Sequence, residues 1–186
     1  MKVFVDFADV KFYDSSTMFS LISEEILSKY NELYVIKSIS KSYGVPGLRL
    51  GILASHNEHL ISQIKKMVSI WNVNSFAEFY MQISGKYAKE YNFSLEQVRK
   101  SRNQLIQGLN SIPWVRVIPS QANYVMCEML NGIKSSSIAY LLLEKNILVK
   151  DLSHKIHNGQ QYIRIAVRCE EDNEKLIRAM NSIVIR

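Results

Sequence analysis

The sequence contains little glycine, proline or cysteine. Its 186 residues include 7 Gly, 3 Pro and 2 Cys, and no stretch rich in Pro and Gly marks a linker. The two cysteines, Cys127 and Cys169, have no Cys-x-x-Cys spacing and no histidine pattern beside them. Isolated cysteines of this kind are usually buried thiols, so we predict neither a disulfide framework nor a metal site.

Long hydrophobic runs are also lacking, since no apolar stretch reaches the roughly 18 residues of a membrane-spanning helix. The first residues, "MKVFVDFADVKFYD", carry acids early and have no small-residue cleavage site, so they do not resemble a secretory signal. An apolar fraction of 47% with 22% charged residues is typical of a soluble globular protein. We therefore expect a cytoplasmic protein without a membrane partner.

The formal net charge is +6, which raises the question of an anionic partner. Lysines and arginines are scattered among acids, and the densest cluster is only Lys65 and Lys66 on a predicted helix face. This pattern favours a solvated surface over a nucleic-acid interface. We expect no nucleic-acid partner.

Hydrophobic periodicity divides the chain into two parts. Residues 1 to about 80 alternate strands with helices, as in a sheet covered on its faces, with strands predicted near 2–8, 33–38 and 48–54. From about residue 90 the predicted order is helix, two strands, helix, two strands, helix, which suits a small α+β domain. We place the domain boundary between residues 88 and 89.

Capping signals suggest where three of the helices begin. Ser15 or Ser16 is a candidate N-cap for a helix reaching about residue 30, and Asn57 for the next helix. The long amphipathic helix of the second part is predicted to start at Ser94, with Gly108 as a weak point near its end.

The stretch "SISKSYGVPGLRLG", residues 38–51, gathers glycines around a lysine and an arginine. Lys41 could serve as a reactive amine, and Ser38 and Ser40 could bind phosphate oxygens. Arg49 offers a planar fork suited to a phosphate, and the glycines allow tight turns. Such a group would fit pyridoxal phosphate. By itself the motif is typical of an ordinary loop, and it is not a P-loop.

Asp6 ends the first predicted strand. A buried carboxylate is costly unless it has a partner, and the pyridinium nitrogen of pyridoxal phosphate is such a partner. A lone aspartate at a strand end is more commonly a cap or turn residue. Asp6 therefore indicates a cofactor site only in combination with Lys41.

The motifs "VFVDFAD", "SISKSYGVPGLRLGILAS", "WNVNS", "PSQANYV", "ILVKDLS" and "YIRIAV" follow one another in a single order. Together they resemble the fold-type-I pyridoxal-phosphate enzymes of aminotransferase class I/II, in the branch of histidinol-phosphate aminotransferase and threonine-phosphate decarboxylase. The resemblance covers nearly the whole chain. It implies an α/β fold in which the C-terminal part of the large transferase domain, residues 1–88, precedes a small α+β domain, residues 89–186.

The resemblance also assigns roles in a cofactor site. Lys41 corresponds to the lysine that forms the internal aldimine and moves the proton between substrate and cofactor. Asp6 corresponds to the partner of the ring nitrogen. The cofactor phosphate would be bound by Ser38, Ser40 and Arg49.

Two further residues correspond to substrate-binding positions. Arg164, in "YIRIAV", corresponds to the residue that binds the substrate α-carboxylate, a task that suits a bidentate guanidinium. Asn123 matches a motif position without a defined role. Asn72 and Asn74, in "WNVNS", are interpreted as loop caps or pocket-lining residues.

The sequence departs from the family at two positions. Asp9 stands where the family usually has a tyrosine that supports the phenolic oxygen of the cofactor, and Tyr13 is a weak substitute. Lys150 stands where the family has arginine, which removes a fork of donors and puts recognition of phosphate or acidic side chains there in doubt.

Members of the family are about twice as long as this chain. We therefore interpret it as the C-terminal portion of such an enzyme, without the Gly-rich turn, the stacking aromatic ring and much of the dimer interface. Strands cut from their larger sheet would leave apolar surfaces and edges exposed. The expectation is a chain that is oligomeric or marginally stable, with little or no activity alone, from a parent that forms a homodimer.

Three functions remain open from the sequence. The first is transamination of an amino acid or amino-acid phosphate, with a keto acid as co-substrate. The second is decarboxylation of an amino-acid phosphate, which uses the same lysine, arginines and aspartate. The third is a non-catalytic fragment that serves assembly.

Overall fold

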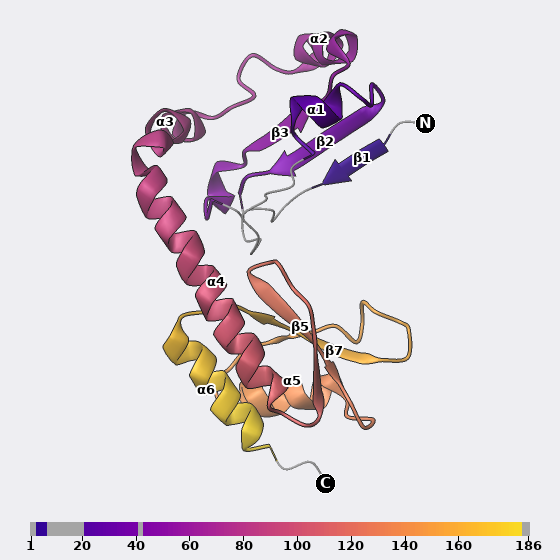
Figure 1. Cartoon of the computed structure of the whole chain (residues 1–186), viewed down its shortest axis with the longest axis vertical. Helices are drawn as coiled ribbons and strands as arrows, with labels where there is room; N and C mark the ends of the chain where they lie inside the picture. The colour runs from indigo at the N-terminus through magenta and orange to yellow at the C-terminus, as the bar shows by residue number, and fades with distance from the viewer. Residues whose placement is uncertain (1–2, 7–20, 41–42, 184–186) are drawn as a thin grey trace. The chain divides into compact units, whose positions relative to one another are not determined.

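The computed structural model describes residues 3–6, 21–40 and 43–183; of β1 only the backbone is described. The chain divides into two compact units, Met1–Phe93 and Ser94–Arg186. Figure 1 shows the helices and strands of the two units. Among the described residues, no helix combines the length and the apolar character that crossing a membrane requires.

The first unit contains a mixed three-stranded sheet. Its strands are β1 (Val3–Asp6), β2 (Leu33–Ser38) and β3 (Gly51–Ala54), in the order β1-β2-β3. β1 runs parallel to β2, and β3 runs antiparallel to it. β2 is central and its first three residues are buried, as its run of β-branched and aromatic residues predicts.

Several short helices and turns complete the first unit, and the long helix α4 begins in it. They are α1 (Glu24–Leu27), η2 (Pro46–Leu48), α2 (Glu58–Met67), α3 (Ser75–Ser84), η3 (Gly85–Tyr87) and α4 (Ala88–Asn110). The predicted cap of α2 is confirmed, because the Asn57 side chain accepts a hydrogen bond from the Leu60 amide at 3.0 Å.

Two helix predictions are wrong. In the described part of residues 15–30 only Glu24–Leu27 is α-helical. The long helix begins at Ala88 and not at Ser94, because the turn η3 runs directly into it and Ser94 lies inside the helix. A polar residue in a helix interior resembles a cap when only the sequence is available.

The first unit exposes large apolar side chains on its sheet and beyond α2. Neighbouring residues of a strand point to opposite faces, and on β3 both Ile52 and Leu53 are exposed, at 45% and 37%. Ile70 and Trp71, between α2 and α3, are 90% and 87% exposed. Such surfaces are typical of interfaces, which agrees with the expected exposure of apolar faces.

The second unit contains an antiparallel four-stranded sheet. Its strands are β4 (Val115–Ile118), β5 (Tyr124–Met129), β6 (Lys150–Asp151) and β7 (Gln161–Ala166), in the order β4-β5-β7-β6. The strand predicted over "ILVKDLS" is therefore only two residues long. β5 and β7 form the longest ladder, from the pair Tyr124 and Ala166 to the pair Met129 and Gln161.

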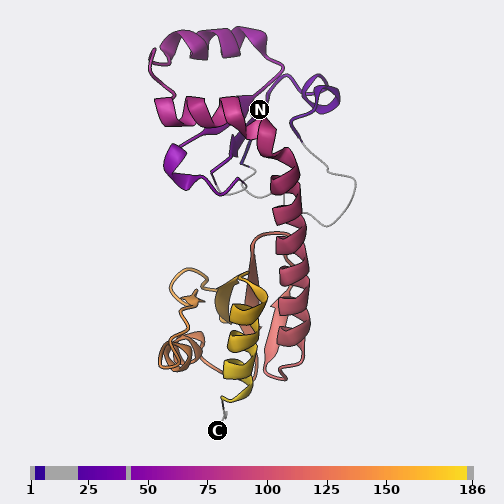
Figure 2. The ribbon, with the colours of Figure 1, turned by 90° about the vertical axis from the view of Figure 1, so that its left-hand side faces the viewer.

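Helices cover one face of this sheet. α5 (Ser135–Leu143), α6 (Glu170–Asn181) and the C-terminal part of α4 lie on the same side (Figure 2). Their apolar stripes enclose a core with the alternate strand residues Val125, Cys127 and Met129. The side chains between these, such as Met126, belong to the opposite face.

The two cysteines differ in their surroundings. Cys127 is buried, as predicted, and burial raises the pKa of its thiol to about 12. Cys169 is exposed just before α6, so the prediction of a buried thiol is wrong there. Gly108 has a packing role beyond that of a weak point, since a Cβ at this position would lie 3.0 Å from Cγ1 of Ile177 on α6.

Candidate functional site

The strand register of the first unit brings predicted site residues to one edge of its sheet. Asp6 ends β1 opposite Ile36 of the parallel strand β2, and two residues later Ser38 ends β2. The antiparallel strand β3 begins at Gly51, opposite Ser38. Asp6, Ser38 and the start of β3 therefore share one edge, formed by the carboxyl ends of the parallel strands, where ligands of open α/β sheets bind.

The connection from β2 to β3 folds back on itself at this edge. The amide of Ile39 donates to the Leu50 carbonyl at 3.3 Å, which extends the ladder past the last strand pair. The amide of Val45 donates to the Ser40 carbonyl at 2.8 Å, and Gly44 between them has a φ of +67°. This φ lies in the left-handed region, which explains the glycine. We call residues 39–50 the β2–β3 loop.

Arg49 has an unusual backbone conformation at the end of this loop. Its φ is +56°, in the left-handed region that long side chains rarely adopt. Its Nη1 donates to the Pro46 carbonyl at 3.3 Å, and the residue is exposed. Non-glycine residues in this conformation are concentrated at ligand sites, so the backbone of Arg49 favours a role in ligand binding.

The predicted residues of the first unit differ in accessibility. Ser38 is half-buried, whereas Ser40 is only 5% exposed. Lys41, the predicted catalytic lysine, lies outside the described residues, as do Asp9 and Tyr13. The structure thus places the backbone on either side of Lys41.

Asn74 connects α3 to the β2–β3 loop. Its Oδ1 caps α3 by accepting from the Ala77 amide at 3.0 Å, and its Nδ2 donates to the Leu48 carbonyl at 3.0 Å. The interpretation of Asn74 as a cap is confirmed, but the contact with the loop is an additional function that the sequence does not reveal.

The face of the second unit's sheet that the helices do not cover holds two cations side by side. Arg164 on β7 pairs directly with Lys150 on β6, and both side chains are exposed. The Arg164 guanidinium lies over the ring of Tyr124 on β5, 5.0 Å from its centre. Tyr124 is diagonally across the ladder, because Arg164 pairs with Met126. The aromatic face thus directs the guanidinium of Arg164.

Asn123 immediately precedes β5, and the residue before it, Ala122, is bound by an arginine that the sequence prediction missed. The Asn123 carbonyl accepts from the Val167 amide at 2.9 Å. The fully buried Arg102 of α4 donates from Nη1 to the carbonyl of Ala122 at 3.1 Å. Arg102 lies on the same apolar helix face as Leu95 and Leu105, seven residues after the first and three before the second, and this spacing would have indicated its burial.

A hydrogen-bonded aspartate follows Lys150. Burial alone would raise the pKa of Asp151, but hydrogen bonds from Ser135 and Ser153 outweigh it and lower this pKa. The Ser135 hydroxyl donates to Oδ1 at 2.6 Å and the Ser153 hydroxyl to Oδ2 at 2.7 Å. These bonds fix the short strand β6 next to β7, so they also hold Lys150 beside Arg164.

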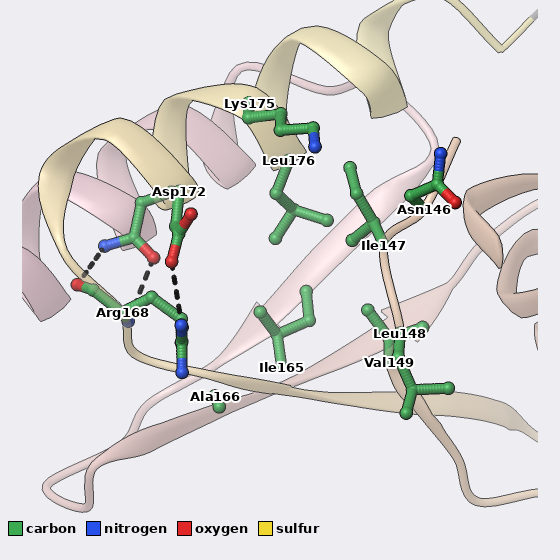
Figure 3. A pocket seen from close by; sticks show the side chains of 11 residues that line it. Asn146, Ile147, Leu148, Val149, Ile165, Ala166, Arg168, Asp172, Lys175 and Leu176 are labelled. Atoms are coloured by element: carbon green, nitrogen blue, oxygen red, sulfur yellow. Dashed lines mark hydrogen bonds and ion pairs between the residues drawn. The ribbon is translucent and has the colours of Figure 1, made fainter.

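A cavity of about 370 Å³ lies on the helix-covered side of the second unit. Figure 3 shows it between α6, β7 and residues 146–149, with Ile165 and Leu176 facing it and the ion pair of Arg168 and Asp172 at one end. None of the predicted site residues whose side chains the structure describes lines it. Because neighbouring strand residues alternate, Arg164 points to the opposite face from Ile165.

Comparison with known proteins decides the family. The family model "Aminotransferase class I and II" matches residues 1–183. The chain belongs to this family. The resemblance inferred from the motifs is confirmed.

Three relatives illustrate how far the likeness reaches. "CMP-5'-(3-aminopropyl)phosphonate synthase" of Streptomyces rubellomurinus is 33% identical over 85% of this chain and 26% of its own length. "L-serine phosphate decarboxylase" of Sulfurospirillum multivorans is 30% identical over 98% of this chain and 47% of its own. The solved histidinol-phosphate aminotransferase from Clostridium acetobutylicum is 26% identical, with a TM-score of 0.84 over 98% of this chain and 55% of that chain.

The chain thus spans about half the length, or less, of the curated relatives it matches. The predicted fold class is confirmed, since the structural neighbours have the aminotransferase fold and this chain covers part of it. The chain is a fragment-length member of the class I/II aminotransferases and their decarboxylase relatives.

Proposed function

We propose that this chain supplies the lysine-bearing part of a pyridoxal-phosphate site in an enzyme that transfers amino groups. The observation that carries the proposal is the strand register, which brings the backbone of Asp6, Ser38 and Gly51 to one edge of the sheet, and Lys41 and Arg49 belong to the sequence that connects Ser38 to Gly51. Membership of the aminotransferase family supports the cofactor. Domains of residues 1–88 and 89–186 and a cytoplasmic location remain predictions.

The residues at this edge fit the chemistry of the cofactor. Hydroxyl and guanidinium donors from Ser38, Ser40 and Arg49 suit a phosphate dianion, and a carboxylate at the end of the neighbouring strand suits a protonated ring nitrogen. Bound pyridoxal phosphate would withdraw electrons from the substrate α-carbon. Asp6 would keep a proton on the ring nitrogen, and the amine of Lys41 would take up the proton from the α-carbon.

In the second unit we assign Arg164 to the substrate α-carboxylate, with Asn123 as a further substrate contact. Directly opposed cations on neighbouring strands repel each other, so the pair of Arg164 and Lys150 costs stability until an anion lies beside it. Two adjacent cations suit a substrate with two anionic groups, such as an amino-acid phosphate.

The second candidate reaction is decarboxylation of an amino-acid phosphate. It is favoured by the similarity to "L-serine phosphate decarboxylase", which is 30% identical over 98% of this chain. Transamination is our first choice because the family model and several relatives are aminotransferases. Release of carbon dioxide against formation of a keto acid separates the two reactions.

We extend the proposal to a homodimeric parent and to weak or absent turnover by this chain alone. The exposed apolar side chains Ile70 and Trp71 support a covered interface. A monodisperse monomer that turns over an amino acid unaided would contradict this part of the proposal.

An absorbance titration tests the proposed function. Adding pyridoxal phosphate to the chain should produce the visible band of a lysine-bound cofactor, and Lys41→Ala should abolish it. Lys65→Ala, on the outer face of α2, is the matched control and should leave the band unchanged. A band that survives Lys41→Ala, or no band in the unmodified chain, would show that the chain is a non-catalytic piece.

A further inference from the structure

Two tyrosines stack between the β2–β3 loop and the long helix in the first unit. The rings of Tyr43, in the loop, and Tyr91, on α4, are 4.7 Å apart at their centres and inclined by only 9°. Tyr43 lies two residues beyond Lys41. Parallel ring pairs at this separation are favourable beyond the area they bury.

The surroundings of the stack are open on one side. A cavity of about 460 Å³ is lined by four tyrosines, Tyr43, Tyr80, Tyr87 and Tyr91, together with neighbouring residues of α3 and η3. Burial, and then the proximity of Tyr43, raise the pKa of the Tyr80 phenol, so Tyr80 belongs to the same cluster. The cavity leaves one side of the cluster open, and the stack with Tyr91 restrains the Tyr43 ring on the side of α4.

The stack and Asn74 hold the loop at two points. Tyr91 restrains Tyr43 at the start of the loop, and Asn74 binds the Leu48 carbonyl near its end. Between these points lie Gly44 in the left-handed region and the Val45 amide that binds Ser40. Backbone hydrogen bonds also hold this turn, since the Tyr43 amide donates to the Ile39 carbonyl at 3.1 Å and the Val45 amide to the Ser40 carbonyl at 2.8 Å, and the two side-chain anchors add to them.

We propose that Tyr91 is a positioning residue that acts through Tyr43. By stacking on Tyr43 it fixes the turn around Ser40 and thereby sets the orientation of the amine of Lys41 toward the cofactor. This inference rests on the proposed function for the role of Lys41, but the restraint on the loop stands on the contacts alone.

Hydrogen exchange of the Val45 amide measures the restraint without cofactor. Replacing Tyr91 by serine should speed its exchange about threefold to tenfold, as loss of an aromatic pair implies. Tyr91→Phe keeps the ring and should preserve the original rate. Tyr87→Ser is the matched control, since Tyr87 lines the same cavity but is 57% exposed and lies outside the stack.

A second measurement tests the effect on Lys41. The pH dependence of the lysine-bound cofactor band should shift in Tyr91→Ser and return to its original position in Tyr91→Phe. Global stability, followed by urea unfolding, distinguishes this local effect from general loosening.

The outcomes separate the inference from the proposed function. Equal exchange rates in Tyr91→Ser and the unmodified chain overturn the restraint. Faster exchange with an unchanged pH profile overturns the positioning of Lys41 while the cofactor site stands. If the cofactor does not bind at Lys41 in the unmodified chain, the proposed function is contradicted, and so is the role of Tyr91 in positioning Lys41. The hydrogen-exchange rates then still decide whether the stack restrains the loop.

Discussion

The guanidinium carbon of Arg164 lies 5.0 Å from the centre of the Tyr124 ring, across the diagonal of the β5–β7 ladder. A cation over an aromatic face at an exposed site contributes about 0.5–1 kcal/mol. A double-mutant cycle with Tyr124→Leu and Arg164→Leu should therefore give a coupling energy of this size in urea unfolding. Tyr124→Phe retains an aromatic face and should keep most of it. A coupling energy of zero would mean that the ring does not direct the guanidinium.

Lys150 lies opposite Arg164, and we expect this pair of like charges to lower the folding stability of the second unit when no anion is bound. Since like charges directly opposite each other destabilise a sheet, Lys150→Gln should stabilise the second unit by a few tenths of a kcal/mol to about 1 kcal/mol at low salt. The gain should shrink in about 1 M salt, where charges are screened. Lys145→Gln, on an exposed turn, is the control. A destabilised Lys150→Gln variant would show that Lys150 has another structural role.

Much of the fold follows from local sequence patterns, and the differences have physical causes. The central strand β2 is a short apolar run with few alternatives, and the Asn57 cap is a local interaction. The start of α4 was misplaced because Ser94 resembles a cap, although the turn before Ala88 continues into the helix. The exposure of Cys169 depends on which face of the second unit it occupies, which short-range patterns do not encode.

The residues of the candidate site were predicted from motifs that resemble a known family, whereas their spatial arrangement could not be predicted from local sequence. Ser38 and Arg49 are close in sequence, but only the antiparallel register of β2 and β3 explains why they share an edge. The contacts made by Asn74, Tyr91 and Arg102 join segments far apart in the chain. No local pattern predicts such partners, although the spacing of Arg102 from Leu95 and Leu105 indicates that its side chain faces the core.

Arg102 is expected to be structurally important despite its charge. Arg102→Met would remove the guanidinium donor of the Ala122 carbonyl, and a hydrogen bond to a charged group contributes about 1.5–3 kcal/mol. The control Lys100→Met changes an exposed residue two positions earlier and should alter the free energy of unfolding by less than about 0.5 kcal/mol. Equal effects of the two substitutions in urea unfolding would contradict the anchoring of this loop by Arg102.

Asp151 makes the second unit sensitive to acid. The hydrogen bonds from Ser135 and Ser153 lower its pKa in the folded state below the ordinary 3.8, after overcoming the opposing effect of burial. The stabilisation from these bonds is therefore fully present above the unfolded pKa and is lost as the pH falls through the lower folded value. Asp151→Asn should be less stable than the unmodified chain at pH 7, and the difference should narrow below about pH 4.

Urea unfolding at a series of pH values measures this narrowing. Glu144→Gln, on the exposed end of α5, controls for the loss of one negative charge. A constant difference between Asp151→Asn and the unmodified chain at all pH values would show that the carboxylate form contributes nothing specific.

The most direct test of the central claim is reductive trapping of pyridoxal phosphate on this chain, followed by peptide mapping. We predict that the phosphopyridoxyl group is found on Lys41 in preference to the exposed lysines Lys65 and Lys66. Inorganic phosphate should suppress the labelling, Arg49→Ala should weaken it, and pyridoxal without its phosphate should lack the preference. Labelling spread evenly over surface lysines, with no effect of phosphate or of Arg49→Ala, would contradict the claim that this chain carries a cofactor site.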